Sequence, residues 1–141
     1  MKRFTDDYLL FLLAQASGNA SAAFHAQLAA KGIPVSTWRI LATLHPDTPA
    51  SIGELAESCL TKQPTMTRQI DRLTKAGLVT RDAAKSDRRR VQVALTPAGR
   101  SLADQLTALA RTHEAKVLQG YSAQQVADLK SVLSGLLSPK G

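Results

Sequence analysis

The 141-residue sequence lacks the features of exported or membrane-bound proteins. Cys59 is the single cysteine, so no internal disulfide can form, which fits a reducing compartment. No apolar run approaches the length of a membrane span, and the short one near the N-terminus is opened by Asp6 and Asp7, which makes it a poor signal peptide. We therefore expect a cytoplasmic protein without a membrane partner.

The residue patterns that accompany catalysis and metal binding are missing as well. His25, His45 and His113 are scattered, with no neighbouring cysteine and no paired ligand spacing. The sequence has no glycine-rich phosphate loop and no pair of carboxylates on one strong helical face. We expect no enzymatic activity, no metal site and no cofactor.

Positive charge and helix-forming residues are what the sequence does have. Aromatic residues make up only 4%, and the apolar content comes mainly from Ala and Leu, which favour helix. The formal net charge is +7. Residues 51–100 hold ten basic and five acidic side chains, so most of the excess charge lies in the middle of the chain. A basic protein attracts polyanions, of which nucleic acid is the commonest.

Hydrophobic spacing predicts a mainly helical chain. One helix is expected to start near Thr5–Asp7 and to run to Lys31–Gly32, and a second to run from about Ser36 to Leu44. Two further helices are expected at the C-terminal end, one from Thr96–Pro97 to Gly120 and one after the capping pattern at 122–125.

The middle of the chain predicts a helix-turn-helix. Ser51 and Glu54 form a capping-box pattern that opens a short helix. A brief turn leads into a second helix, in which Pro64 is tolerated in the first turn and Gly77 is a natural stop. The apolar face of the first helix is expected to consist of Ile52, Leu55, Ala56, Cys59 and Leu60, and that of the second of Met66, Ile70 and Leu73.

The opposite face of the second helix is polar. Its side chains can reach base edges and phosphates, and they are Gln63, Thr65, Thr67, Arg68 and Arg72. The competing interpretation is an ordinary solvated face.

A basic hairpin follows and favours the DNA-binding interpretation. Leu78–Arg81 and the alternating Val91, Val93 and Leu95 predict two strands. The tip between them is expected to run from Asp82 to Arg90, and the residues from Arg81 to Arg90 include five basic and two acidic ones. Such a hairpin after a helix-turn-helix is a wing, placed to lie along the DNA backbone or to enter a minor groove.

The terminal helices carry more apolar surface than the small winged part can cover. Uncovered stripes of this kind indicate a homodimer, and a dimer presents two recognition helices to a pseudo-palindromic DNA site. The competing interpretation is that these helices fold back onto the core of a monomer.

With these motifs the sequence resembles the MarR family of bacterial regulators over nearly its whole length. The most specific part is the wing, with Asp87-Arg88-Arg89, the strand to Leu95, and Thr96-Pro97-Ala98-Gly99 in the family's DxR…LTxxG pattern. The segment 65–79 matches the recognition-helix pattern, and Trp38-Arg39-Ile40-Leu41 matches the second helix.

The resemblance implies one MarR-type domain over 1–141. Residues 34–96 would form the winged helix-turn-helix, and 1–33 and 97–141 the dimerisation helices of a triangular dimer, giving six helices and a two-stranded wing. It further implies a repressor of nearby genes that releases double-stranded DNA when a small molecule binds.

Carried onto this sequence, the resemblance extends the set of DNA-binding candidates. Pro64 joins the recognition helix, where it offers an apolar contact to a thymine methyl group. The wing candidates are Lys85, Arg88, Arg89 and Arg90, with Asp87 orienting an arginine.

Effectors in the family often bind between the dimerisation helices and the winged part. On this sequence the walls of that cleft would include Phe24, His25, Trp38 and Arg39, a set suited to an aromatic carboxylate or a phenolic compound. The alternative is that Trp38 belongs to the core and Arg39 pairs with an acidic neighbour.

Other functions stay open at this point. A nonspecific architectural DNA-binding protein would need the same charge but no ordered polar face. A redox-responsive regulator would have to act through Cys59, although a cysteine in apolar surroundings is usually inert. A regulator whose winged part docks on protein is disfavoured by the basic wing.

Overall fold

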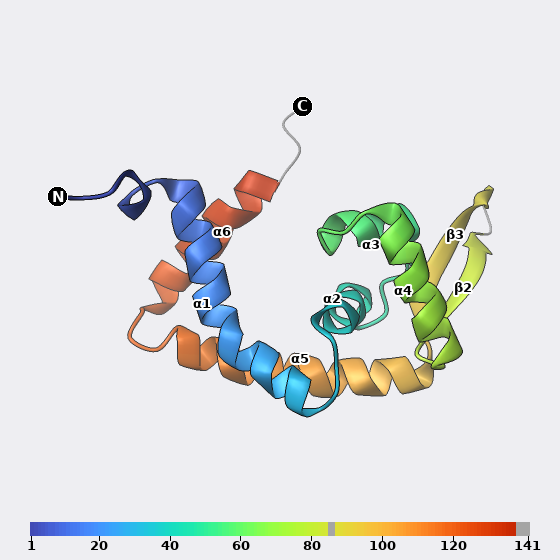
Figure 1. Ribbon diagram of the computed structural model, residues 1–141. Helices are drawn as coiled ribbons and strands as arrows, with labels where there is room; N and C mark the ends of the chain where they lie inside the picture. The colour runs from blue at the N-terminus through green and yellow to red at the C-terminus, as the bar shows by residue number, and fades with distance from the viewer. Residues whose placement is uncertain (85–86, 138–141) are drawn as a thin grey trace. The chain divides into compact units, whose positions relative to one another are not determined.

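The computed structural model describes residues 1–84 and 87–137, with side chains described except at 83–84 and 87–90. The chain forms two compact units, Met1–Ala110 and Arg111–Gly141 (Figure 1). The described elements are η1 (Phe4–Asp6), α1 (Leu9–Ala30), α2 (Val35–Leu44), β1 (Ala50–Ser51), α3 (Ile52–Ser58), α4 (Gln63–Lys75), β2 (Val79–Ala84), β3 (Asp87–Leu95), α5 (Pro97–Val117) and α6 (Ala123–Leu137). The mainly helical winged fold predicted from the sequence is confirmed.

The N-terminal helix starts later than predicted. Asp6 accepts the Arg3 backbone N–H at 3.0 Å and closes the 3₁₀ turn η1 instead of opening α1. The helix proper begins at Leu9. Its buried side chains are Phe24 and Leu28, so the apolar residues of its first half stay largely uncovered.

The helix-turn-helix packs around a continuous apolar core. Ser51 caps α3, because its hydroxyl accepts the Glu54 N–H at 3.1 Å. The Glu54 carboxylate accepts the Ser51 hydroxyl, and not the Ser51 backbone N–H as in a full capping box. The buried members of the first core are Ile40, Leu44, Ala50, Leu55, Ala56, Cys59, Met66, Ile70, Leu73, Val79 and Val93. The predicted stripe of α4 is thus confirmed, whereas Leu60, expected on the buried face of α3, is 87% exposed.

The wing belongs to a three-stranded antiparallel sheet in the order β1-β3-β2. β1 was not predicted, because two residues are too few to show an alternating pattern. It pairs Ala50 with Val93. The predicted tip at 82–90 was too long, since β2 and β3 stay paired as far as Ala84 and Asp87, with an irregularity at 83–84.

A second core joins α5 to the helices α1 and α2. Its buried members are Phe24, Leu28, Leu41, Ala103 and Leu106. Half-buried side chains, among them Trp38 and Leu102, surround it. Both cores lie in the unit 1–110.

The start of α5 is tied to the end of α4. The Thr96 hydroxyl donates to the Gly77 carbonyl at 2.6 Å and accepts the Gly99 N–H at 3.0 Å. Gly99 is buried so close to the backbone of Leu78 that an added Cβ would lie 1.9 Å from the Leu78 carbonyl oxygen. The Thr and Gly of the LTxxG pattern therefore hold the recognition helix, the wing and α5 at one junction.

The described part of the second unit, residues 111–137, is a helical hairpin made of the end of α5 and α6. Ser122 and Gln125 form the predicted capping box, with the Gln125 N–H donating to the Ser122 hydroxyl and the Ser122 N–H to Gln125 Oε1. Glu114 joins the two helices through Lys130 at 3.1 Å and also pairs with Arg111 at 2.9 Å. Over 111–137 no side chain is fully buried.

Candidate nucleic-acid interface

Two opposite faces of α4 define the candidate interface. Met66, Ile70 and Leu73 anchor one face in the first core. The other face is polar, and its exposed residues are Gln63, Pro64, Arg68 and Arg72. Thr65 and Thr67 on this face are partly buried. The apolar anchor therefore sets the rotation of the helix and turns its polar side chains outward.

Local hydrogen bonds organise two of these polar residues. Arg68 Nη2 donates to Thr65 Oγ1 at 3.3 Å, which holds the guanidinium near the start of the helix. The Thr67 hydroxyl donates to the Gln63 carbonyl at 3.0 Å, so Thr67 keeps acceptor capacity for an outside partner. Lys62, the N-cap of α4, is exposed beside them.

An ion pair connects the recognition helix to the wing. Arg81 on β2 donates to the carboxylate of Asp71 on α4. Because Asp71 is anchored one residue after the buried Ile70, the pair fixes the base of the wing against the helix. This contact joins residues of two elements and had no signal in the local sequence pattern.

The predicted wing residues fall on β3 or outside the described residues. Asp87, Arg88, Arg89 and Arg90 are the first four residues of β3 and were expected in a loop. Lys85 lies outside the described residues. The roles of these residues in DNA binding stay predictions.

Of the four expected effector residues, Phe24 belongs to the second core and Trp38 packs against it. Phe24 is buried and meets Trp38 edge-on, with ring centroids 5.1 Å apart. Trp38 and His25 are half-buried and Arg39 is exposed. The Phe24 ring is thus a packing element, while the charge of Arg39 lies near Cys59 of the first core.

Cys59 is buried at the end of α3, as predicted. Its Sγ lies 3.8 Å from Thr43 Oγ1. Burial raises the pKa of the Cys59 thiol, and the Thr43 hydroxyl and the charge of Arg39 lower it only in part. The thiol therefore stays protonated and weakly nucleophilic at neutral pH.

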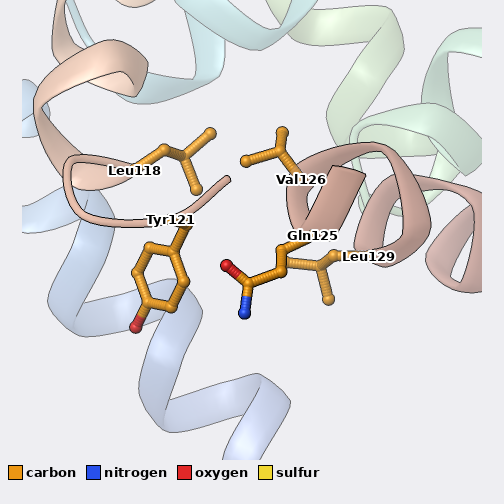
Figure 2. Close-up of a pocket in the computed structure, with 5 residues that line it drawn as sticks. All are labelled: Leu118, Tyr121, Gln125, Val126 and Leu129. Carbon is orange, nitrogen blue, oxygen red and sulfur yellow. The ribbon is translucent and has the colours of Figure 1, made fainter. Parts of the chain in front are cut away.

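A pocket lies in the unit 111–141 and has an apolar lining (Figure 2). Leu118 and Tyr121 lie on one side of the pocket and Val126 and Leu129 on the other, with the Gln125 amide between them. The empty volume is about 240 Å³ and is open to solvent. None of the predicted site residues lines it. Among the described residues, no three His, Cys, Asp or Glu side chains are grouped to hold a metal, and no helix could cross a membrane.

Comparison with known proteins identifies the family. The MarR family model matches residues 33–91, which contain the helix-turn-helix and most of the wing. A MarR family transcriptional regulator from Silicibacter pomeroyi DSS-3 is 43% identical, over 96% of this chain and 97% of its own, with a TM-score of 0.84. The chain belongs to the MarR family.

Two more solved structures resemble this MarR family member, the first in sequence and fold and the second in fold alone. A probable transcriptional regulator from Pseudomonas aeruginosa is 30% identical over 93% of this chain and 98% of its own, with a TM-score of 0.72. Bordetella bronchiseptica BpsR, whose DNA binding is regulated by 6-hydroxynicotinic acid, shares the fold at 21% identity and a TM-score of 0.80, over 99% of both chains. The protein is a transcription regulator with a winged-helix DNA-binding fold.

Proposed function

We propose that the protein is a homodimeric repressor that reads a pseudo-palindromic site in double-stranded DNA. α4 enters the major groove with Gln63, Thr65, Thr67, Arg68 and Arg72, and Pro64 meets a thymine methyl group. The observation that carries the proposal is the division of α4 into a buried apolar face and an outward polar face beside the wing. A protein that only coats DNA has no need of an ordered polar face.

The dimer is supported by apolar surface on the terminal helices. Phe4, Leu10 and Phe11 at the N-terminal end, and Val132 and Leu136 on α6, are each more than two-fifths exposed in the single chain. Uncovered apolar side chains clustered on an element in this way mark interfaces between proteins. A twofold dimer would cover these side chains and present two copies of α4.

Fluorescence anisotropy tests sequence recognition. The wild-type protein is titrated into a duplex that it selects from random-sequence DNA, and into a scrambled duplex, at fixed near-physiological salt. We expect a preference of about a thousandfold or more for the selected duplex. Equal affinity for both duplexes would establish the architectural alternative.

The wing is tested by Arg89→Ala. Removal of a charge that contacts the DNA backbone should weaken binding to the selected duplex without unfolding the dimer. It should also reduce the slope of log affinity against log salt concentration by about one. Lys116→Ala, which removes the same charge from the exposed surface of α5, is the control. Unchanged affinity of Arg89→Ala at moderate salt would remove the wing from the proposal.

We further propose that an aromatic carboxylate or phenolic compound releases the DNA. Arg39 is exposed on α2 one residue after the half-buried Trp38 and would supply a bidentate partner for a carboxylate. His25 follows the buried Phe24 on α1, and the Phe24 ring meets Trp38. 6-Hydroxynicotinic acid, which regulates DNA binding by BpsR, a protein of the same fold, belongs to this chemical class. A panel of aromatic acids added to the protein–DNA complex tests release, and Arg39→Gln should abolish it while DNA affinity without ligand is kept.

The alternative of redox control through Cys59 has little structural support. The thiol is 2% exposed and its pKa is raised by burial. Reaction with iodoacetamide at neutral pH should be slow in the folded protein and fast in urea. Rapid oxidation of the folded protein by peroxide, with loss of DNA binding that Cys59→Ser prevents, would reinstate this alternative.

A further inference from the structure

Leu60 stands out because its backbone and its side chain are both unusual. It follows α3 in the turn of the helix-turn-helix and has a φ of +55°. Its N–H donates to the Glu57 carbonyl at 3.2 Å, and the Thr61 N–H donates to the Ala56 carbonyl at 2.9 Å, which closes the turn. The side chain is 87% exposed.

The left-handed conformation is costly for a residue with a Cβ atom. The three other positive-φ positions of the described chain are occupied by glycine, namely Gly32, Gly77 and Gly120. Leu60 bears the steric cost and recovers no burial within its own chain. The hydrogen bonds that close the turn account for the backbone conformation, so the exposed apolar side chain at this costly position is what points to a partner outside the chain.

The place of Leu60 in the fold identifies that partner as DNA. In a helix-turn-helix the first helix crosses the DNA backbone and the N-terminal end of the second enters the major groove. Leu60 lies between these two parts, two residues before the exposed Lys62 and three before Gln63, the first residue of α4. Half or more of the hydrogen bonds between proteins and DNA go to the sugar-phosphate backbone.

We propose that Leu60 packs against the deoxyribose groups of the DNA backbone at the edge of the groove that α4 enters. The inference rests on the proposed DNA-binding function and adds a contact to it. Because the contact is apolar and made to sugar, it contributes affinity with little dependence on base sequence or salt.

Four proteins test this contact: the wild type, Leu60→Met, Leu60→Ala and Leu60→Gly. Anisotropy is measured at several salt concentrations with the duplex selected by the wild type, and thermal unfolding is measured without DNA. Leu60→Met keeps an apolar side chain and should bind within about twofold of wild type. Leu60→Ala and Leu60→Gly should each lose about fivefold to tenfold in affinity, with an unchanged salt slope.

Thermal unfolding separates contact from strain. Leu60→Gly relieves the left-handed strain that Leu60→Ala keeps, so it should unfold at a temperature a few degrees higher than Leu60→Ala, by about 2–4 °C. If the Leu60 side chain contacts DNA, Leu60→Ala and Leu60→Gly should lose DNA affinity equally despite this difference in stability. A purely structural role predicts that affinity follows stability, and that result would overturn the proposal.

Three further outcomes would also overturn it. Wild-type affinity in both truncated variants would show that Leu60 does not meet DNA. A reduced salt slope would show that the loss comes from displaced cationic side chains. A weakened dimer in sedimentation would show that a second copy of the chain covers Leu60. Failure of the wild type to prefer its selected duplex would instead reject the proposed function itself.

Discussion

The apolar stripes of α4 and α6 have similar spacing and opposite environments. On α4, Met66, Ile70 and Leu73 are at most 4% exposed. On α6, Leu129 and Leu136 are about half exposed, and Leu137 is 85% exposed. Helical spacing therefore indicated that both stripes need a partner, but only the tertiary structure shows that α4 finds it within the chain.

The comparison separates two uses of apolar surface in this MarR family member. The stripe of α4 fixes the orientation of the recognition face and belongs to the folding core. The stripe of α6 is available for association, which agrees with the proposed dimer. Substitutions should act on stability in the first case and on association in the second.

The largest effect is expected from truncating the α4 stripe. Ile70→Ala removes a fully buried side chain and should lower the free energy of unfolding by about 2–5 kcal/mol, measured by urea denaturation. Leu136→Ala on α6 is the matched variant. It should leave the stability of the single chain within about 1 kcal/mol and weaken dimerisation in sedimentation equilibrium. An equal loss of stability in both variants at all protein concentrations would contradict the distinction.

Two glycines provide a second contrast. Gly99→Ala places a Cβ against the Leu78 backbone and should destabilise the unit 1–110 by about 3 kcal/mol. Gly135→Ala on α6 meets nothing within 4 Å and should be neutral or stabilising by up to about 1 kcal/mol. Thermal unfolding of the two variants checks the signs, and a stable Gly99→Ala protein would disprove the close junction between α5 and the wing.

The Asp71–Arg81 ion pair gives a smaller effect, on DNA binding. Asp71→Asn removes the contact between α4 and β2, so the wing is less well positioned and affinity for the selected duplex should fall by about threefold to tenfold. The doubly exchanged variant Asp71→Arg with Arg81→Asp should recover part of the loss. If Arg81 instead contacted DNA directly, the exchange would make binding worse than either single change does.

The smallest effect is expected at Glu114 and depends on pH. Bonds to Lys130 and Arg111 lower the pKa of the Glu114 carboxyl below its ordinary value. A lowered pKa means that the carboxylate stabilises the folded state above the pKa of the unfolded chain, near 4.5, and that this contribution is lost as the pH falls through the folded value.

Thermal unfolding at pH 7 and pH 3 measures the Glu114 contribution. Glu114→Gln should be slightly less stable than wild type at pH 7, and the difference should shrink at pH 3. Glu57→Gln, at an exposed position of α3, removes the same charge and is the control. A difference that persists unchanged at pH 3 would show that the carboxylate charge is not responsible.

Most of the fold could be predicted because local signals agreed with one another. The capping residues Ser51, Thr96 and Ser122 and the stop at Gly77 lie at the expected helix ends, since a cap depends on neighbours a few residues away. Three expectations were wrong: the wing strands extend further than their apolar residues, Asp6 closes a separate turn before α1, and Leu60 is exposed. The strand β1 was missed because two residues are too few to show a pattern.

The candidate site was predictable as a set of residues but not as an arrangement. The spacing of the apolar residues on α4 predicted which of its side chains point outward. Thr65 and Arg68, which form a hydrogen bond in the structure, were both among the predicted DNA-binding residues. The pair of Asp71 and Arg81 and the exposure of Leu60 could not be read from the sequence. The first depends on a contact between two elements, and the second on a backbone conformation that leucine rarely adopts.

By itself the sequence determined the helical class, the helix-turn-helix, the basic wing and the resemblance to the MarR family, because these depend on residue spacing and charge. The tertiary structure decided which apolar residues are covered, how α5 is attached to the recognition helix through Thr96 and Gly99, and which polar side chains are held by partners. Burial and contact depend on elements far apart in the chain, and no local pattern encodes where those elements meet.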